Sequence, residues 1–144
     1  MRQLRRISAI LCLALFAACD ELDEITPGDT YELVEAEGEP LPAVVFEGEL
    51  EGFGHVVATA VSGSITLRET TYTERFVIDL TTEAGEFPGD PIVIHGDYTA
   101  DGALLTFEPD REDYPSFTGT LSGAVLTTTE VHPEMGTLTL VWER

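Results

Sequence analysis

Lysine is absent from this chain, and cysteine occurs only as Cys12 and Cys19, both close to the start. Seven arginines stand against 27 carboxylates, so the formal net charge at pH 7 is −20. Nucleic acid and anionic lipid headgroups are bound through clustered positive charge, and this composition excludes both as direct partners. The negative charge is expected to serve solubility, or to attract a cationic partner or metal ions.

Long hydrophobic runs are also missing, apart from about ten residues at 7–16 that follow three arginines. This run is too short for a membrane-spanning helix, which needs roughly 20 residues, but it suits a secretory signal. The small pair Ala17-Ala18 directly before Cys19 resembles the lipobox of bacterial lipoproteins. The resemblance implies that residues 1–18 are a cleaved signal helix and that Cys19 carries the lipid. It further implies a location in the bacterial cell envelope, with the membrane and leaflet left open.

Lipidation of Cys19 would use the last thiol, because Cys12 leaves with the signal. Disulfides, cysteine zinc sites and thiol nucleophiles are then excluded together, and the domain must rely on its core and backbone hydrogen bonds. Residues 19–144 hold four arginines and all 27 carboxylates, a formal charge of about −23. Residues 19–29 are the lipidated cysteine followed by an acidic segment, which we expect to be a flexible tether.

From residue 30 onward the sequence favours β-strands separated by glycine-containing turns. Four similar segments, at 62–65, 101–104, 122–125 and 135–138, place Gly before a small and then an apolar residue. Because Gly permits the positive φ of tight turns, each segment predicts a hairpin. Apolar and polar residues alternate along the intervening runs, which is typical of a sheet with one buried and one solvated face. The expected strands are 30–35, 43–50, 54–61, 64–68, 71–81, 91–99, 103–108, 115–121, 124–130 and 137–142.

These patterns predict an all-β fold for a single domain over 30–144. We expect an antiparallel up-and-down meander of eight to ten strands forming a small barrel, with a β-sandwich as the alternative. Short hairpins favour closure, since a barrel leaves no exposed strand edge. The hairpin pattern resembles that of small lipocalin-like envelope lipoproteins, although the Gly-x-Trp of true lipocalins is absent and the only tryptophan is Trp142.

Metal-binding and catalytic patterns are not found. His55, His95 and His132 include no H-x-H or H-x-x-x-H pair, so we expect solvated or hydrogen-bonded histidines and no metal site. The acidic stretch 108–115 lacks EF-hand spacing and is expected to be a solvated hairpin end. Serine is scarce, and no G-x-S-x-G elbow or phosphate-cradling glycine loop is present. With 27 acids, spacing singles out no catalytic carboxyl pair, and we expect neither enzymatic activity nor a cofactor.

The remaining functional indication is the barrel itself, because small barrels often hold a ligand at the mouth. Phe53, between two glycines in a predicted turn, is expected to act as a lid or a partner contact. With Tyr98 and Trp142 it forms our candidate ligand-binding set. The sequence thus predicts a non-enzymatic, lipid-anchored barrel that binds a small apolar ligand. The alternatives are a protein-interaction module, for example an inhibitor of a cationic enzyme such as lysozyme, and a metal-dependent hydrolase.

Overall fold

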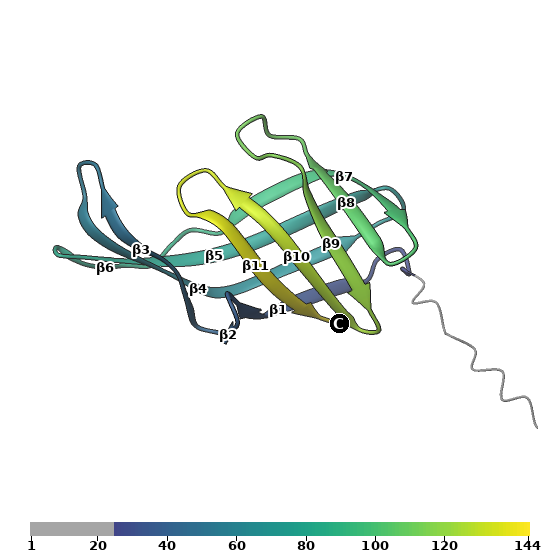
Figure 1. Ribbon diagram of the computed structural model, residues 1–144, viewed down its shortest axis with the longest axis horizontal. Coiled ribbons are helices and arrows are strands. Elements are labelled where there is room, and N and C mark those ends of the chain that lie inside the picture. The colour runs from purple at the N-terminus through teal and green to yellow at the C-terminus, as the bar shows by residue number, and fades with distance from the viewer. Residues whose placement is uncertain (1–24) are drawn as a thin grey trace, which may run out of the picture.

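The computed structural model describes residues 25–144, which form eleven β-strands and no helix (Figure 1). The predicted signal peptide, Cys19 and most of the predicted tether lie outside these residues. The strands are β1 (Thr30–Ala36), β2 (Glu39–Pro40), β3 (Ala43–Leu50), β4 (Gly54–Leu67), β5 (Thr71–Thr82), β6 (Gly85–Phe87), β7 (Ile92–Asp101), β8 (Leu104–Pro109), β9 (Phe117–Ser122), β10 (Val125–His132) and β11 (Gly136–Glu143).

Eight strands close into an antiparallel barrel, which confirms the predicted barrel over the sandwich. The order around it is β1-β11-β10-β9-β8-β7-β5-β4, and β4 returns to β1 through the pair Tyr31↔Ile65. Neighbouring strands mostly follow one another in sequence, as in a meander. The alternation read from the sequence sets the inner and outer faces, since successive side chains of a strand point to opposite sides.

Strands β4 and β5 are longer than the barrel wall and continue beyond it. In this part β3 pairs with the first half of β4, and β6 pairs with the end of β5. The result is a four-stranded extension in the order β3-β4-β5-β6, which we call the wing (residues 43–60 and 78–87). In Figure 1 the wing projects from the left end of the barrel. The wing extends the barrel wall on the side of β4 and β5 beyond the ends of the other strands.

One predicted turn is wrong. Ser62-Gly63 lies within β4, so the expected strands 54–61 and 64–68 are a single strand with a register shift between Ala60 and Ser62. Gly63 instead leaves space for two aromatic rings in the barrel interior. A Cβ at this position would lie 3.1 Å from the Trp142 ring and 3.2 Å from the Phe76 ring. The other three predicted hairpins are confirmed, with positive φ at Gly102, Gly123 and Gly136. The short strands β2 and β6 were not predicted.

The end of the barrel opposite the wing is filled by aromatic side chains. The rings of Phe107 and Phe117 stack with centroids 4.6 Å apart, and Tyr72 meets Phe107 edge-on at 5.0 Å. Tyr98 lies against the same group, with its ring 6.0 Å from Phe107. Such rings bury large apolar areas and prefer these stacked and edge-on geometries. This filled end leaves the wing end as the place where a cavity forms.

The described chain both starts and finishes at the filled end. Gly28 donates its amide to the Leu67 carbonyl, and Arg144 pairs with Asp29 at 2.5 Å. Figure 1 shows the C-terminus at this end, away from the wing. The first described residues therefore lie at the end of the barrel opposite its open mouth.

Candidate functional site

A cavity of about 350 Å³ opens at the wing end of the barrel. Volumes of 300–1,000 Å³ are usual for small-molecule sites. One wall consists of wing residues, the opposite rim consists of the β8–β9 and β10–β11 loops, and His132 lies at the floor. The lining residues are Phe46, Leu50, Val56, Ala58, Ile78, Leu80, Ile92, Arg111, Asp113, Tyr114, His132, Pro133, Glu134 and Met135.

The apolar wall follows directly from strand alternation. Val56 and Ala58 on β4, and Ile78 and Leu80 on β5, are spaced two residues apart and face the cavity. Deeper residues of the same faces belong to the barrel core, but the wing has no opposite barrel wall to cover it. Leu80 consequently remains 38% exposed. The cavity is thus a continuation of the core surface with part of its covering missing.

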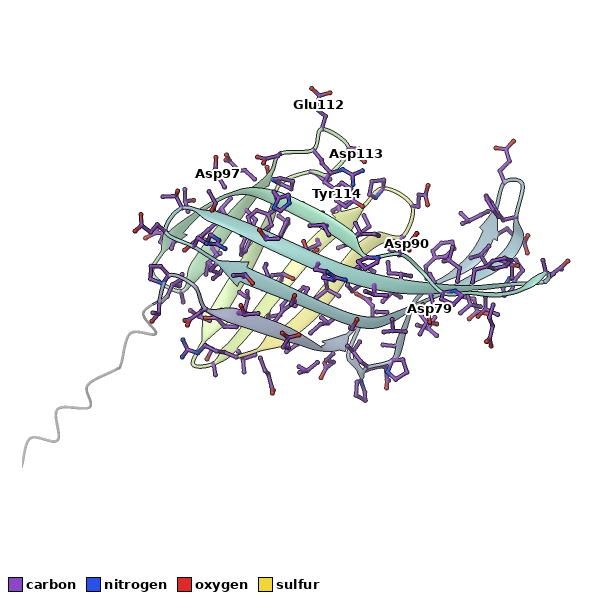
Figure 2. All side chains as sticks on the ribbon, turned by 180° about the vertical axis from the view of Figure 1, so that it is seen from behind. Asp79, Asp90, Asp97, Glu112, Asp113 and Tyr114 are labelled. Atoms are coloured by element: carbon purple, nitrogen blue, oxygen red, sulfur yellow. The ribbon has the colours of Figure 1, made fainter. Side chains whose placement is uncertain are left out.

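The acidic loop between β8 and β9 forms the opposite rim. Arg111 donates to the Asp113 carboxylate at 2.5 Å and lies 4.6 Å from the Tyr114 ring centroid. The hydrogen bond from Arg111 lowers the pKa of Asp113. Figure 2 shows Glu112 pointing away into solvent, while Tyr114 lies nearer the barrel. The loop is solvated as expected except at Tyr114, whose ring meets His132 edge-on at 5.7 Å.

A buried polar chain lies below the cavity floor. The Trp142 indole donates to Thr128 Oγ1 at 2.9 Å, and that hydroxyl donates to Glu130 Oε1 at 2.5 Å. The other oxygen of Glu130 lies 3.4 Å from His132 Nε2, which has no hydrogen-bond partner. Thr128, Glu130 and His132 are each at most 3% exposed. Alternate residues of β10 therefore connect the core tryptophan to the cavity.

A second buried carboxyl, Glu74 on β5, lies beside Glu130 and is 1% exposed. Burial first, and then the charge of Glu130, raises the pKa of Glu74 well above its ordinary value. Neither Glu74 oxygen has a donor from the protein, but a proton on Glu74 would have Glu130 as its acceptor. Burial raises the pKa of Tyr72 as well, and the charges of Glu74 and Glu130 add to this effect. The interior thus holds two carboxyls next to one imidazole.

No arginine of the described chain enters this interior. Arg68, Arg75, Arg111 and Arg144 are all exposed on the outside of the barrel or on its loops. Arg75 is adjacent to Glu74 in sequence, but strand alternation directs it to the opposite face. Buried carboxyls normally have a cationic or hydrogen-bonding partner. Glu74 has no arginine beside it, and the partner that it can hydrogen-bond with is another carboxyl, Glu130.

This cluster was missed from the sequence, although a signal for it was present. Glu74 lies midway between the inward-facing Tyr72 and Phe76, so alternation alone puts it inside the barrel. Glu130 and His132 continue the inward series of Leu126 and Thr128. His132 was expected in a solvated or hydrogen-bonded turn, but it is the last residue of β10 and is 3% exposed. His55 and His95 are exposed, as expected from their strand faces.

The three residues assigned to ligand binding from the sequence do not come together. Phe53 is 70% exposed at the tip of the wing. Tyr98 is buried at the filled end, where its hydroxyl donates to the Arg68 carbonyl at 2.6 Å. Trp142 is fully buried in the core. None of the three lines the cavity, and Trp142 is linked to it only through Thr128 and Glu130.

Within residues 25–144, no three histidine, cysteine or acidic side chains converge in a way that would hold a metal ion. The same residues include no helix long and apolar enough to cross a membrane. Comparisons of the chain with protein-family models, with curated proteins and with solved structures found no match.

Proposed function

We propose that this protein is a lipid-anchored, non-enzymatic binding protein of the bacterial cell envelope, and that its barrel mouth holds a small, mainly apolar molecule. The observation that carries this proposal is the cavity of about 350 Å³ between the wing and the barrel loops. Its largest wall is apolar, and a few polar groups lie together at the floor and rim. This combination is the usual composition of small-molecule sites.

The position of the chain start supports the anchoring part of the proposal. The lipobox-like Ala17-Ala18-Cys19 precedes the described residues, which begin at the filled end. A lipid on Cys19 would hold that end toward the membrane and leave the cavity facing away from it. Mass spectrometry of protein purified from bacterial membranes would test this. A diacylglyceryl-modified N-terminal cysteine is expected, and an unmodified or uncleaved chain would contradict the anchor.

Binding can be tested with the neutral fluorescent probe N-phenyl-1-naphthylamine. Its emission should increase on binding to the full chain in which Cys19→Ser prevents lipid attachment. Ala58→Leu should weaken this binding, because Ala58 lines the cavity and a larger side chain fills it. Ala100→Leu, on an exposed position of β7 at the filled end, is the matched control. Near-UV circular dichroism shows whether each variant is folded.

Unaltered probe binding in folded Ala58→Leu would rule out this cavity as the site. Native mass spectrometry of freshly purified protein adds an independent measurement. A retained small molecule is the expected result. A protein that is empty and also fails to bind the probe would overturn the proposed function.

A second candidate, a protein-interaction module, is favoured by the exposed apolar residues of the wing. Val44, Phe53 and Phe87 are 52%, 70% and 49% exposed, and acidic residues lie among them. A cationic enzyme such as lysozyme would match this surface in charge. Binding that weakens steeply with salt and is lost in Phe53→Ser, but not in Val131→Ser on the barrel wall, would support this candidate. Binding that is insensitive to salt would contradict it.

A further inference from the structure

We propose that the ligand of the mouth cavity carries a protonated amine, and that the Glu74–Glu130 pair below His132 binds this group while the wing covers the apolar part. The inference rests on the proposed function and names the chemical class of the ligand. Three independent features support it: a cavity, a buried carboxyl that receives no hydrogen bond from the protein, and an interior that no arginine of residues 25–144 enters.

Glu74 is buried without a donor. Neither of its oxygens receives a hydrogen bond from the protein, and the neighbour that could accept its proton is the carboxyl of Glu130. Leaving such acceptors unsatisfied is costly, so a buried carboxyl without donors is normally explained by a function. An ammonium group has three N–H donors and no acceptor. It would therefore supply the hydrogen-bond donors that the Glu74 oxygens lack.

Positive charge is scarce around the Glu74–Glu130 pair. The four arginines of residues 25–144 are exposed, and the only basic group beside the pair is His132. Two carboxyls therefore share one imidazole inside the barrel. A ligand ammonium would supply the missing charge in a poorly solvated place, where electrostatic attraction is stronger than in water. A carboxylate or phosphate head would be repelled by the same pair.

His132 lies between the cavity and Glu130. Its side chain lines the cavity, and its Nε2 is 3.4 Å from a Glu130 oxygen. The imidazole is held between the Phe76 and Tyr114 rings, at 5.7 Å from each. Its Nε2 has no hydrogen-bond partner. We expect the amine to displace this imidazole from Glu130, while the apolar part of the ligand lies against the wing.

Acidic residues at the rim add long-range attraction. Asp113, Glu134 and Arg111 line the cavity, and Glu112 lies between Arg111 and Asp113, so three carboxylates stand against one guanidinium at the rim. With a net charge of −20, the protein attracts cations and repels anions at a distance. The rim field and the floor pair therefore select the same sign of charge.

Release of the Glu74 proton gives a second way to detect amine binding. Burial and Glu130 favour a proton on Glu74 in the empty site. An ammonium next to the pair would stabilise the carboxylate instead, so binding should release a proton to solvent. The other titratable groups near Glu74 are His132, Tyr72, Tyr114 and, farther along the β8–β9 loop, Asp110. Calorimetry in buffers of different ionisation enthalpy measures this release.

The test compares three probes with the same apolar chain: n-decylamine, n-decanol and n-decanoate. Each is titrated below its aggregation concentration into the full chain carrying Cys19→Ser. We expect the amine to bind about tenfold or more tightly than the alcohol, the scale of a hydrogen bond to a charged group. Decanoate should bind most weakly. Glu74→Gln should remove the preference for the amine and leave decanol binding intact, whereas Glu108→Gln, on the exposed face of β8, should change nothing.

Equal affinity for the three probes would overturn the amine assignment and leave the proposed function standing. A preference for the amine that persists in Glu74→Gln would also overturn it, since attraction by the surface charge would then explain the preference. Failure of all three probes to bind would overturn the proposed function as well.

Discussion

The Trp142 indole donates a hydrogen bond to the Thr128 hydroxyl across 2.9 Å, deep inside the barrel. The same hydroxyl donates to Glu130, which lies beside His132 at the cavity floor. Trp142 is the only tryptophan of the chain, so the emission of a single residue reports on the polar chain below the cavity. Changes at the floor can therefore be followed without an added label.

Thr128→Val is expected to destabilise the protein by about 1–3 kcal/mol, because it leaves a buried indole N–H and a buried carboxylate oxygen without partners. Trp142 emission should change as well, since its hydrogen bond is lost. Urea unfolding followed by tryptophan fluorescence measures both effects. Thr129→Val is the matched control, because Thr129 is exposed on the outer face of the same strand. Equal stability of the two variants would contradict this account of the buried chain.

Glu74→Gln is expected to stabilise the protein at neutral pH. The folded state holds a proton on Glu74 above the ordinary pKa of 4.5, so it binds more protons than the unfolded state. Stability from this group is therefore present at low pH and is lost as the pH rises from 4.5 through the raised pKa. A glutamine stays neutral, and its amide can donate to Glu130.

The check is the urea midpoint of both proteins between pH 4 and pH 8. The advantage of Glu74→Gln should be smallest near pH 4 and should increase as the pH rises. Glu108→Gln removes one exposed carboxylate and controls for the general decrease in negative charge. A constant difference across the whole pH range would show that Glu74 titrates normally.

Gly63→Ala is expected to destabilise the barrel by about 1–3 kcal/mol, the usual cost of overpacking. The added Cβ would lie 3.1 Å from both the Arg75 carbonyl oxygen and the Trp142 ring. The carbonyl belongs to a paired strand and cannot move aside readily. Ser62→Ala, at an exposed neighbouring position, is the control. Unchanged thermal unfolding in Gly63→Ala would mean that the interior has more freedom here than the contacts indicate.

Tyr114→Ala is expected to speed the release of a bound probe, because the ring covers His132 from the β8–β9 loop. Tyr114→Phe should release the probe at the wild-type rate, since it keeps the ring and loses only the hydroxyl. Stopped-flow dissociation of N-phenyl-1-naphthylamine gives the two rates. If both variants release the probe as the wild type does, the loop does not cover the ligand.

The barrel was predictable because its signals are local. Turn glycines such as Gly102 and Gly123, together with two-residue alternation, specify hairpins that close in sequence order. The wing was not predictable, because it depends on the length by which β4 and β5 exceed their neighbours. The role of Gly63 was not predictable either. A glycine required by a turn cannot be distinguished in the sequence from one that leaves space for a distant side chain such as Trp142.

The candidate site was likewise predictable only in part. Alternation places Glu74, Glu130 and His132 inside the barrel, so their burial follows from the sequence once the strands are known. The contact between these three residues does not follow from the sequence. Strands β5 and β10 lie on separate parts of the wall, and only closure of the barrel brings their inner faces together.

The sequence by itself determined the all-β class, most of the hairpins and the acidic composition, since each depends on neighbouring residues or on composition. Only the tertiary structure decided which end of the barrel is filled, where the cavity opens, and that two buried carboxyls lie beside a single imidazole. Those features depend on contacts between residues far apart in the chain, and barrel closure sets them.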